Sequence, residues 1–209
     1  MVGFGIISYI TNRDFNRPHW RFVVAFLLLF LLASSVAFAT TLVFGIKNNL
    51  FVFHIHTPME YCAVSLLYAS CIESRMIKIA IMISIPVFVV LCIFLSLFIQ
   101  PVTDNNAAMV IVESMLVIIW SLLFIRETIV LQKQNTLLRF PMFWISVGLM
   151  FYFVGAQVID GLLNYLMIES MELARKVYRL MYVFRFALMI LLIVGAYCGI
   201  LFKEKSWES

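Results

Sequence analysis

The chain consists of long apolar runs separated by short polar segments. Six runs are long enough for a helix that crosses a bilayer, which needs about 20 mostly apolar residues. We predict spanning helices at about 20–44, 49–72, 77–99, 107–125, 142–167 and 183–202. The pattern therefore predicts an all-α fold, a polytopic transmembrane bundle of about six helices.

Three further segments complete the expected organisation. The apolar start, 1–19, is too short to span a bilayer and is expected to be an interfacial helix or part of a longer span. Charged and apolar residues alternate in IESMELARKVYRLMYVFR, at 168–185, which predicts an amphipathic surface helix between the fifth and sixth spans. The six spans form one transmembrane domain over 20–202, and 203–209 is a short polar tail.

Composition supports a membrane protein. The 209 residues are 64% hydrophobic and 12% charged, whereas a soluble domain carries about 25% charged residues. The basic residues stand singly at the ends of apolar runs instead of gathering on one solvated face, which excludes nucleic acid as an expected partner. The expected partner is the lipid bilayer.

Lys and Arg in short connecting segments indicate orientation, because they are enriched on the cytoplasmic side. With the N-terminus inside, the inner segments hold ten of these residues and the outer segments hold five. The inner set is Arg13, Arg17, Arg21, Arg75, Lys78, Arg126, Lys133, Arg139, Lys203 and Lys205. The outer set is Lys47, Arg175, Lys176, Arg179 and Arg185. We therefore expect both chain ends to be cytoplasmic.

Ionisable side chains inside the predicted spans are the main candidates for function, because each costs about 2.5–3.5 kcal/mol to insert. His56 and Glu60 lie four residues apart, on one face of the second span. Glu113 and Asp160 lie in the fourth and fifth spans. At 1.5 Å per residue, all four lie roughly 9–16 Å below the same side of the membrane. They predict an outward-facing polar pocket that binds a ligand or senses protons.

His54 belongs to the predicted site with less support than His56. The two residues are about 200° apart around an ideal helix, so they converge only if Pro58 breaks the helix. Structural hydrogen bonding therefore explains His54 better than ligand binding does.

Two amides and two arginines complete the predicted pocket. Gln157 and Asn164 flank Asp160 at helical spacing, and Arg179 and Arg185 are expected at the rim as counter-charges. The alternative is that these polar groups only join helices through hydrogen bonds, each worth about 0.6 kcal/mol on average.

A metal site is a weaker hypothesis. His56, Glu60 and Glu113 are its candidate ligands, because imidazole and carboxylate groups bind divalent metals. The chain has only three histidines, however, and no cofactor is predicted. No serine or cysteine lies in a nucleophile motif such as G-x-S-x-G. No catalytic residue is assigned, and the sequence favours a role other than an enzyme.

Two segments resemble those of a family of small polytopic bacterial membrane proteins of uncharacterised activity. NNLFVFHIHTPMEY fits the pattern N-L-x-x-x-H-x-[YH]-T-x-x-E-Y, and RFPMFWISVGLMFYFVG fits F-W-x-x-x-G-x-x-x-Y. The matching residues are Asn49, Leu50, His54, His56, Thr57, Glu60, Tyr61, Phe143, Trp144, Gly148 and Tyr152. Members are often encoded near sensor histidine kinases, so the resemblance implies signalling and the bacterial cytoplasmic membrane. It carries over no catalytic role.

Several functions are compatible with this sequence. The leading hypothesis is a sensory or signalling module that acts through a membrane or cytoplasmic protein partner, since imidazole titrates near neutral pH. The alternative is a transporter or a proton- or ion-relay subunit. Further alternatives are a structural subunit of a membrane complex and a membrane-embedded, metal-dependent lipid enzyme.

Overall fold

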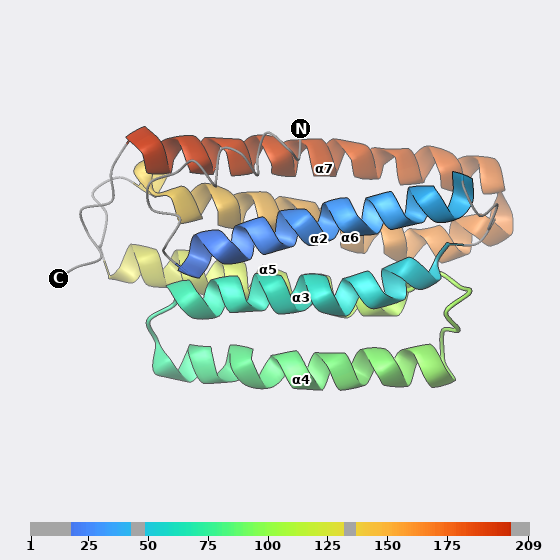
Figure 1. The fold of residues 1–209 in the computed structure, drawn as a ribbon, viewed down its shortest axis with the longest axis horizontal. Coiled ribbons are helices and arrows are strands. Elements are labelled where there is room, and N and C mark those ends of the chain that lie inside the picture. Colours follow the sequence, from blue (N-terminus) through green and yellow to red (C-terminus); the bar gives the residue numbers. More distant parts are fainter. Residues whose placement is uncertain (1–17, 43–48, 132–136, 202–209) are drawn as a thin grey trace.

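The computed structural model describes residues 18–42, 49–131 and 137–201. In this part the chain forms six long helices that run side by side in alternating directions (Figure 1). They are α2 (Pro18–Leu42), α3 (Phe51–Cys71), α4 (Arg75–Phe98), α5 (Ala107–Val130), α6 (Pro141–Glu169) and α7 (Met171–Leu201), with a short 3-10 turn, η1 (Leu137–Arg139), before α6. The expected N-terminal segment, apart from its last two residues, and the tail 203–209 lie outside the described residues.

Five of these helices, α2, α4, α5, α6 and α7, are long and apolar enough to cross a membrane. Their exposed surfaces carry large hydrophobic side chains, most clearly on α4, where Val87, Val90 and Leu97 are all exposed. Such surfaces are stable only against lipid. The prediction of an all-α, polytopic protein embedded in the lipid bilayer is confirmed.

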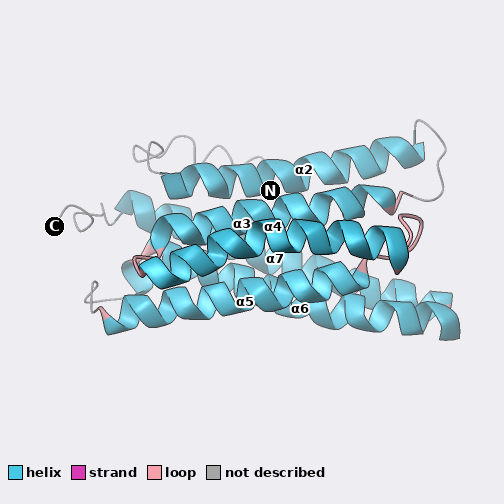
Figure 2. Cartoon of the chain, turned by 90° about the horizontal axis from the view of Figure 1, so that it is seen from below, coloured by secondary structure: helices cyan, strands magenta, loops and turns pink. Residues whose placement is uncertain are grey.

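The expected second span, α3, differs from the other five helices. It forms where predicted but is not among the helices apolar enough to cross a membrane on their own. Its polar side chains, including Glu60 and Ser65, are instead buried by the helices around it. α3 packs against α2, α4 and α5, and Figure 2 shows α2 on one side of it with α5 and α6 on the other. α3 can carry these polar side chains because the neighbouring helices bury them.

The separate surface helix expected at 168–185 is not present. Residues 171–185 instead form the first half of α7, a continuous helix of 31 residues. No Gly or Pro occurs between 171 and 194 to interrupt its hydrogen bonds, so the change from charged to apolar composition does not break it. At 1.5 Å per residue α7 is roughly 46 Å long, longer than the hydrocarbon layer of about 30 Å. The joined ends of α6 and α7 accordingly reach past the ends of α3 and α4 (Figure 1).

Hydroxyl groups connect α3 to its neighbours. The Tyr61 and Ser84 hydroxyls are 2.6 Å apart, and Trp120 Nε1 donates to the Tyr61 hydroxyl at 3.3 Å. Farther along α3, the Tyr68 and Ser121 hydroxyls are 2.7 Å apart. These interactions satisfy polar groups that lipid could not, and they join α3 to both α4 and α5.

The start of α4 is capped by a side chain from α5. The Glu127 carboxylate accepts the Ser74 backbone N–H at 2.8 Å and the Glu73 N–H at 3.2 Å. A carboxylate at this position satisfies free N–H groups and interacts favourably with the positive end of the helix dipole. Glu127 is therefore a structural cap at the end of the bundle opposite the α6–α7 connection.

Glycines allow α6 and α7 to approach closely. A Cβ added at Gly148 would lie 3.0 Å from Leu191 Cβ, and one added at Gly155 would overlap the Phe184 ring. Small residues at helix interfaces in membranes allow this kind of backbone approach. The Phe184 ring fills the space beside Gly155, so this contact sets how α7 lies on α6.

We expect Gly155→Ala to destabilise the protein by about 1–3 kcal/mol, because the new methyl group would displace the Phe184 ring from a packed interface. Gly161→Ala on the same helix is the control, since its Cβ would meet only Ile111 Cδ1 at 3.7 Å. Denaturant unfolding in detergent compares the two variants. Equal stability of both would contradict this account of the α6–α7 interface.

Candidate functional site

A cavity of about 420 Å³ lies between α2, α3, α5, α6 and α7. It occupies the half of the bundle nearer the α2–α3, α4–α5 and α6–α7 connections, which we call the pocket end. Its volume falls within the range of about 300–1,000 Å³ typical of small-molecule sites. Of the ionisable residues singled out in the sequence, His56, Glu60, Glu113, Asp160 and Arg185 line it.

His56 and Glu60 contact each other along one face of α3. His56 Nδ1 lies 3.2 Å from Glu60 Oε2, and the two side chains are 10% and 6% exposed. The second polar atom of each side chain, His56 Nε2 and Glu60 Oε1, is buried with no hydrogen-bond partner in the described part of the chain. Buried polar atoms are nearly always paired in native structures, so these two atoms are available to a bound molecule or to water.

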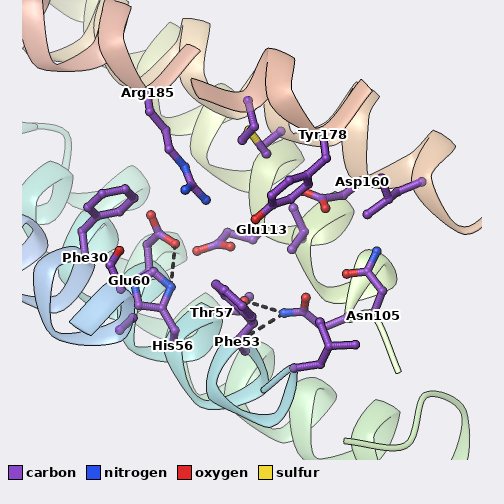
Figure 3. A pocket seen from close by; sticks show the side chains of 18 of the residues that line it. Phe30, Phe53, His56, Thr57, Glu60, Asn105, Glu113, Asp160, Tyr178 and Arg185 are labelled. Carbon is purple, nitrogen blue, oxygen red and sulfur yellow. Dashed lines mark hydrogen bonds and ion pairs between the residues drawn. The ribbon is translucent and has the colours of Figure 1, made fainter. Parts of the chain in front are cut away.

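Glu113 enters the cavity from α5 and is the most deeply buried of these groups. Glu113 is 1% exposed, and its Oε1 has no hydrogen-bond partner among the described residues. Figure 3 shows the Glu113 carboxylate pointing toward Glu60, with the Arg185 guanidinium reaching toward both from α7. Charged groups from three helices therefore converge in one space.

Arg185 is held by aromatic side chains. Its guanidinium carbon lies 5.1 Å from the centre of the Phe30 ring of α2, and Tyr152 of α6 also interacts with the guanidinium. A guanidinium over an aromatic face is attracted by the ring's electrons, more strongly where water is excluded. Arg185 thus bridges α7 to α2 and α6 across the cavity, and it is not the rim residue that we expected, because α7 continues as one helix into the bundle.

Asp160 and the hydrogen bonds donated by Asn106 lie closer to the pocket end. Asp160, on α6, is 9% exposed and lies beside Tyr178 of α7 in Figure 3. Asn106 Nδ2 donates to Thr57 Oγ1 at 2.7 Å and to the Phe53 carbonyl at 3.2 Å, the two dashed bonds below the cavity. The Asn106 amide therefore joins the α4–α5 connection to the turn of α3 that precedes Pro58.

His54 does not line the cavity. Its Nδ1 lies 3.0 Å from Ser96 Oγ and its Nε2 lies 3.0 Å from the Asp104 carbonyl oxygen. α3 stays helical through Pro58, so His54 keeps its position on the opposite face from His56. Both ring nitrogens are used in holding α3 to α4 and to the loop that follows α4, which is the structural role favoured by the helix geometry.

The remaining predicted residues are not in the cavity wall. Gln157 is half-buried but does not line the cavity, since three residues along a helix place it about 60° away from Asp160. The side chain of Asn164 lies outside the described part of the structure. Arg179 is exposed and borders a separate, shallower groove between the ends of α6 and α7.

Some cavity residues were missing from the site predicted from the sequence. Asn106 and Tyr178 are the clearest cases, because one falls in a predicted connection and the other in the predicted surface helix. Tyr152 and Thr57 do occur in the two segments quoted for the family resemblance, but their place in the cavity depends on which way α6 and α3 are turned. Phe30 lies in the uniformly apolar stretch 22–33, where nothing in the sequence sets it apart from its neighbours.

The proposed metal ligands do not form a metal cluster. Over residues 18–42, 49–131 and 137–201, no three His, Cys, Asp or Glu side chains are grouped so that they could hold one metal ion. His56, Glu60 and Glu113 share the cavity wall without meeting at one point. The arrangement is better suited to a molecule that fills the space between these groups.

No protein-family model, no curated protein and no solved structure matches this chain. Its description therefore rests on the fold and on the cavity: a polytopic membrane protein whose charged residues surround an internal space.

We expect His54→Leu to lower stability, because the substitution removes two hydrogen bonds of α3, each worth about 0.5–1.5 kcal/mol. Unfolding of His54→Leu, Ser96→Ala and the double variant measures the interaction between the two side chains. We expect a coupling energy of about 0.5–1.5 kcal/mol. Strictly additive effects would show that the pair contributes nothing.

Proposed function

We propose that the protein is a sensory or signalling module that binds a small molecule in its internal cavity and transmits the event to a protein partner. The observation that carries this proposal is the cavity itself, in which Glu60, Glu113 and His56 each hold a buried polar atom without a hydrogen-bond partner among the described residues. A bilayer protein keeps such groups at considerable cost. A bound molecule that pairs with them would recover that cost.

The extent of the buried ionisable groups along the bundle favours ligand binding over transport. In the half of the bundle opposite the pocket end, counting only the described residues, no carboxylate, His, Lys or Arg is buried. The core there is apolar apart from hydroxyl groups such as those of Tyr68 and Ser121. A transported ion or solute would need polar groups along its whole path, whereas a bound effector needs them only at its site.

The packing of α7 provides a route for the signal. α7 packs mainly against α6, and the glycine contacts hold these two helices together. Arg185 extends from α7 across the cavity toward α3 and α5 (Figure 3). A ligand that changes the interaction of Arg185 with Glu60 or Glu113 would shift the α6–α7 pair relative to α3, since a ligand favours the conformation it binds better.

The proposal includes an orientation and a kind of partner. The pocket end faces away from the cytoplasm, because the Lys and Arg residues of the sequence are more numerous on the opposite side. The resemblance of segments 48–61 and 139–155 to bacterial membrane proteins encoded near sensor histidine kinases makes such a kinase the first partner to test. The bacterial cytoplasmic membrane is the corresponding location.

A second candidate function is a proton relay. It is favoured by buried hydroxyl groups in the core next to the cavity, including Ser65 and Ser114. Their oxygen atoms have no hydrogen-bond partner in the described residues. With ordered water, such groups could extend from Glu113 toward Tyr68 and Ser121.

If the protein is sensory, Glu60→Gln introduced into the cell of origin should produce the same transcript profile as deletion of the protein. The substitution keeps the shape of the side chain but removes the charge that faces the cavity. Glu172→Gln is the matched control, because Glu172 is 78% exposed and pairs only with Lys176 in the described structure. A Glu60→Gln profile identical to wild type, in cells where deletion changes the profile, would rule out sensing through this cavity.

Proteoliposomes distinguish the second candidate. For a sensory module we expect no proton flux above that of empty vesicles, measured with an enclosed pH-sensitive dye. Flux by the wild type that falls to the background level in Glu113→Gln and persists in Glu172→Gln would instead establish the relay.

A further inference from the structure

The charges around the cavity do not balance. Among the lining residues that the structure describes, Glu60, Glu113 and Asp160 are acidic and Arg185 is the one permanent cation. Protonation of His56 would supply a second positive charge, which still leaves one carboxylate in excess. An unpaired charge at membrane depth is unstable, so the cavity requires one more cation or one more proton.

Glu113 is the carboxylate left over. Glu60 contacts His56 at 3.2 Å, and Asp160 is the least buried of the three carboxylates, at 9% exposed. Glu113 is 1% exposed, projects into the cavity and has an oxygen atom without a hydrogen-bond partner in the described structure. A cationic group placed beside Glu113 would form an ion pair with this buried carboxylate, together with a charge-assisted hydrogen bond where the cation carries an N–H.

The rest of the wall indicates an organic cation and not an inorganic one. Tyr152, Phe153 and Tyr178 present aromatic side chains to the cavity, and Leu163 and Met181 add apolar surface. Aromatic faces together with carboxylates are suited to ammonium groups. A bare metal ion would need several oxygen or nitrogen ligands around one point, and no group of three potential His, Cys, Asp or Glu ligands occurs in the described ranges.

We propose that the cavity binds a small organic ammonium compound, with the ammonium group between Glu113 and Glu60 and an oxygen atom of the ligand facing Arg185. The oxygen is part of the assignment because Arg185 Nε is a buried donor without a partner in the described structure. This inference rests on the proposed ligand-binding function and specifies the class of ligand. An amino alcohol has this chemistry, whether it is a free metabolite or the headgroup of a lipid.

Choline and ethanolamine are suitable probes, and 3,3-dimethylbutan-1-ol is the neutral isostere of choline. The full chain is placed in nanodiscs of phosphatidylglycerol, which carries no ammonium group, and binding is followed by calorimetry and by thermal unfolding. We expect saturable binding of choline or ethanolamine that is roughly tenfold or more tighter than binding of the isostere, since the isostere lacks the charge that pairs with Glu113.

Three variants test the placement of the ammonium group. Glu113→Gln and Glu60→Gln should each weaken ammonium binding by roughly tenfold or more, and the exposed control Glu172→Gln should bind as the wild type does. Size-exclusion chromatography and circular dichroism confirm that each variant is folded. The use of two cavity variants keeps the test valid if one of them does not fold.

A second lipid composition identifies the source of the ligand. If a lipid headgroup occupies the cavity, nanodiscs of phosphatidylethanolamine should weaken the apparent affinity for choline by competition. If the natural ligand is a free amine, the two lipids should give the same affinity. Either result, together with the effects of the variants, supports the proposal.

Other results would overturn it. Equal binding of choline and its neutral isostere, unchanged ammonium binding in folded Glu113→Gln and Glu60→Gln, or no binding of either ammonium probe at millimolar concentration would each exclude an ammonium site. The broader function is tested separately: a neutral or anionic compound that binds the wild type and is lost in Glu113→Gln would overturn the ammonium assignment and leave the ligand-binding function standing.

Discussion

The bilayer cannot solvate polar groups, and the structure depends on this constraint. Five helices meet it with a stretch apolar enough to cross a membrane, whereas α3 carries His54, His56 and Glu60 and depends on neighbouring helices to bury them. The hydroxyl contacts of Tyr61 and Tyr68 satisfy polar groups in the half of α3 farther from the pocket end. The half nearer the pocket end faces the cavity.

The cavity also depends on the fit between α6 and α7. Phe184 occupies the space left by the missing side chain of Gly155, and the next residue along α7 is Arg185. Seating the phenylalanine against α6 therefore directs the neighbouring guanidinium toward Phe30 and the acidic groups of α3 and α5. A packing contact between two helices thus also sets the charge distribution of the site.

The helices, and the level of the acidic groups within them, could be predicted from the sequence because hydropathy and a fixed rise per residue determine both. The rotation of each helix could not. Gln157 and Asp160 are close in sequence, yet only Asp160 reaches the cavity wall. The depth of Arg185 was misjudged because its segment was interpreted as a surface helix, and nothing in an amphipathic pattern shows whether a helix stops at the interface or continues into the membrane. Asn106 was missed because its role depends on a turn of α3 that is distant in sequence.

The connection between α4 and α5 holds α3 at two neighbouring points. The Asp104 carbonyl oxygen contacts the ring of His54, and the amide of Asn106 bonds Thr57 and the Phe53 carbonyl. These attachments lie within about one turn of α3, and together they oppose rotation of that turn about the helix axis. The carboxylate of Glu60 is consequently a fixed reference point, and a conformational response to cavity occupancy would have to come from the helices that face it.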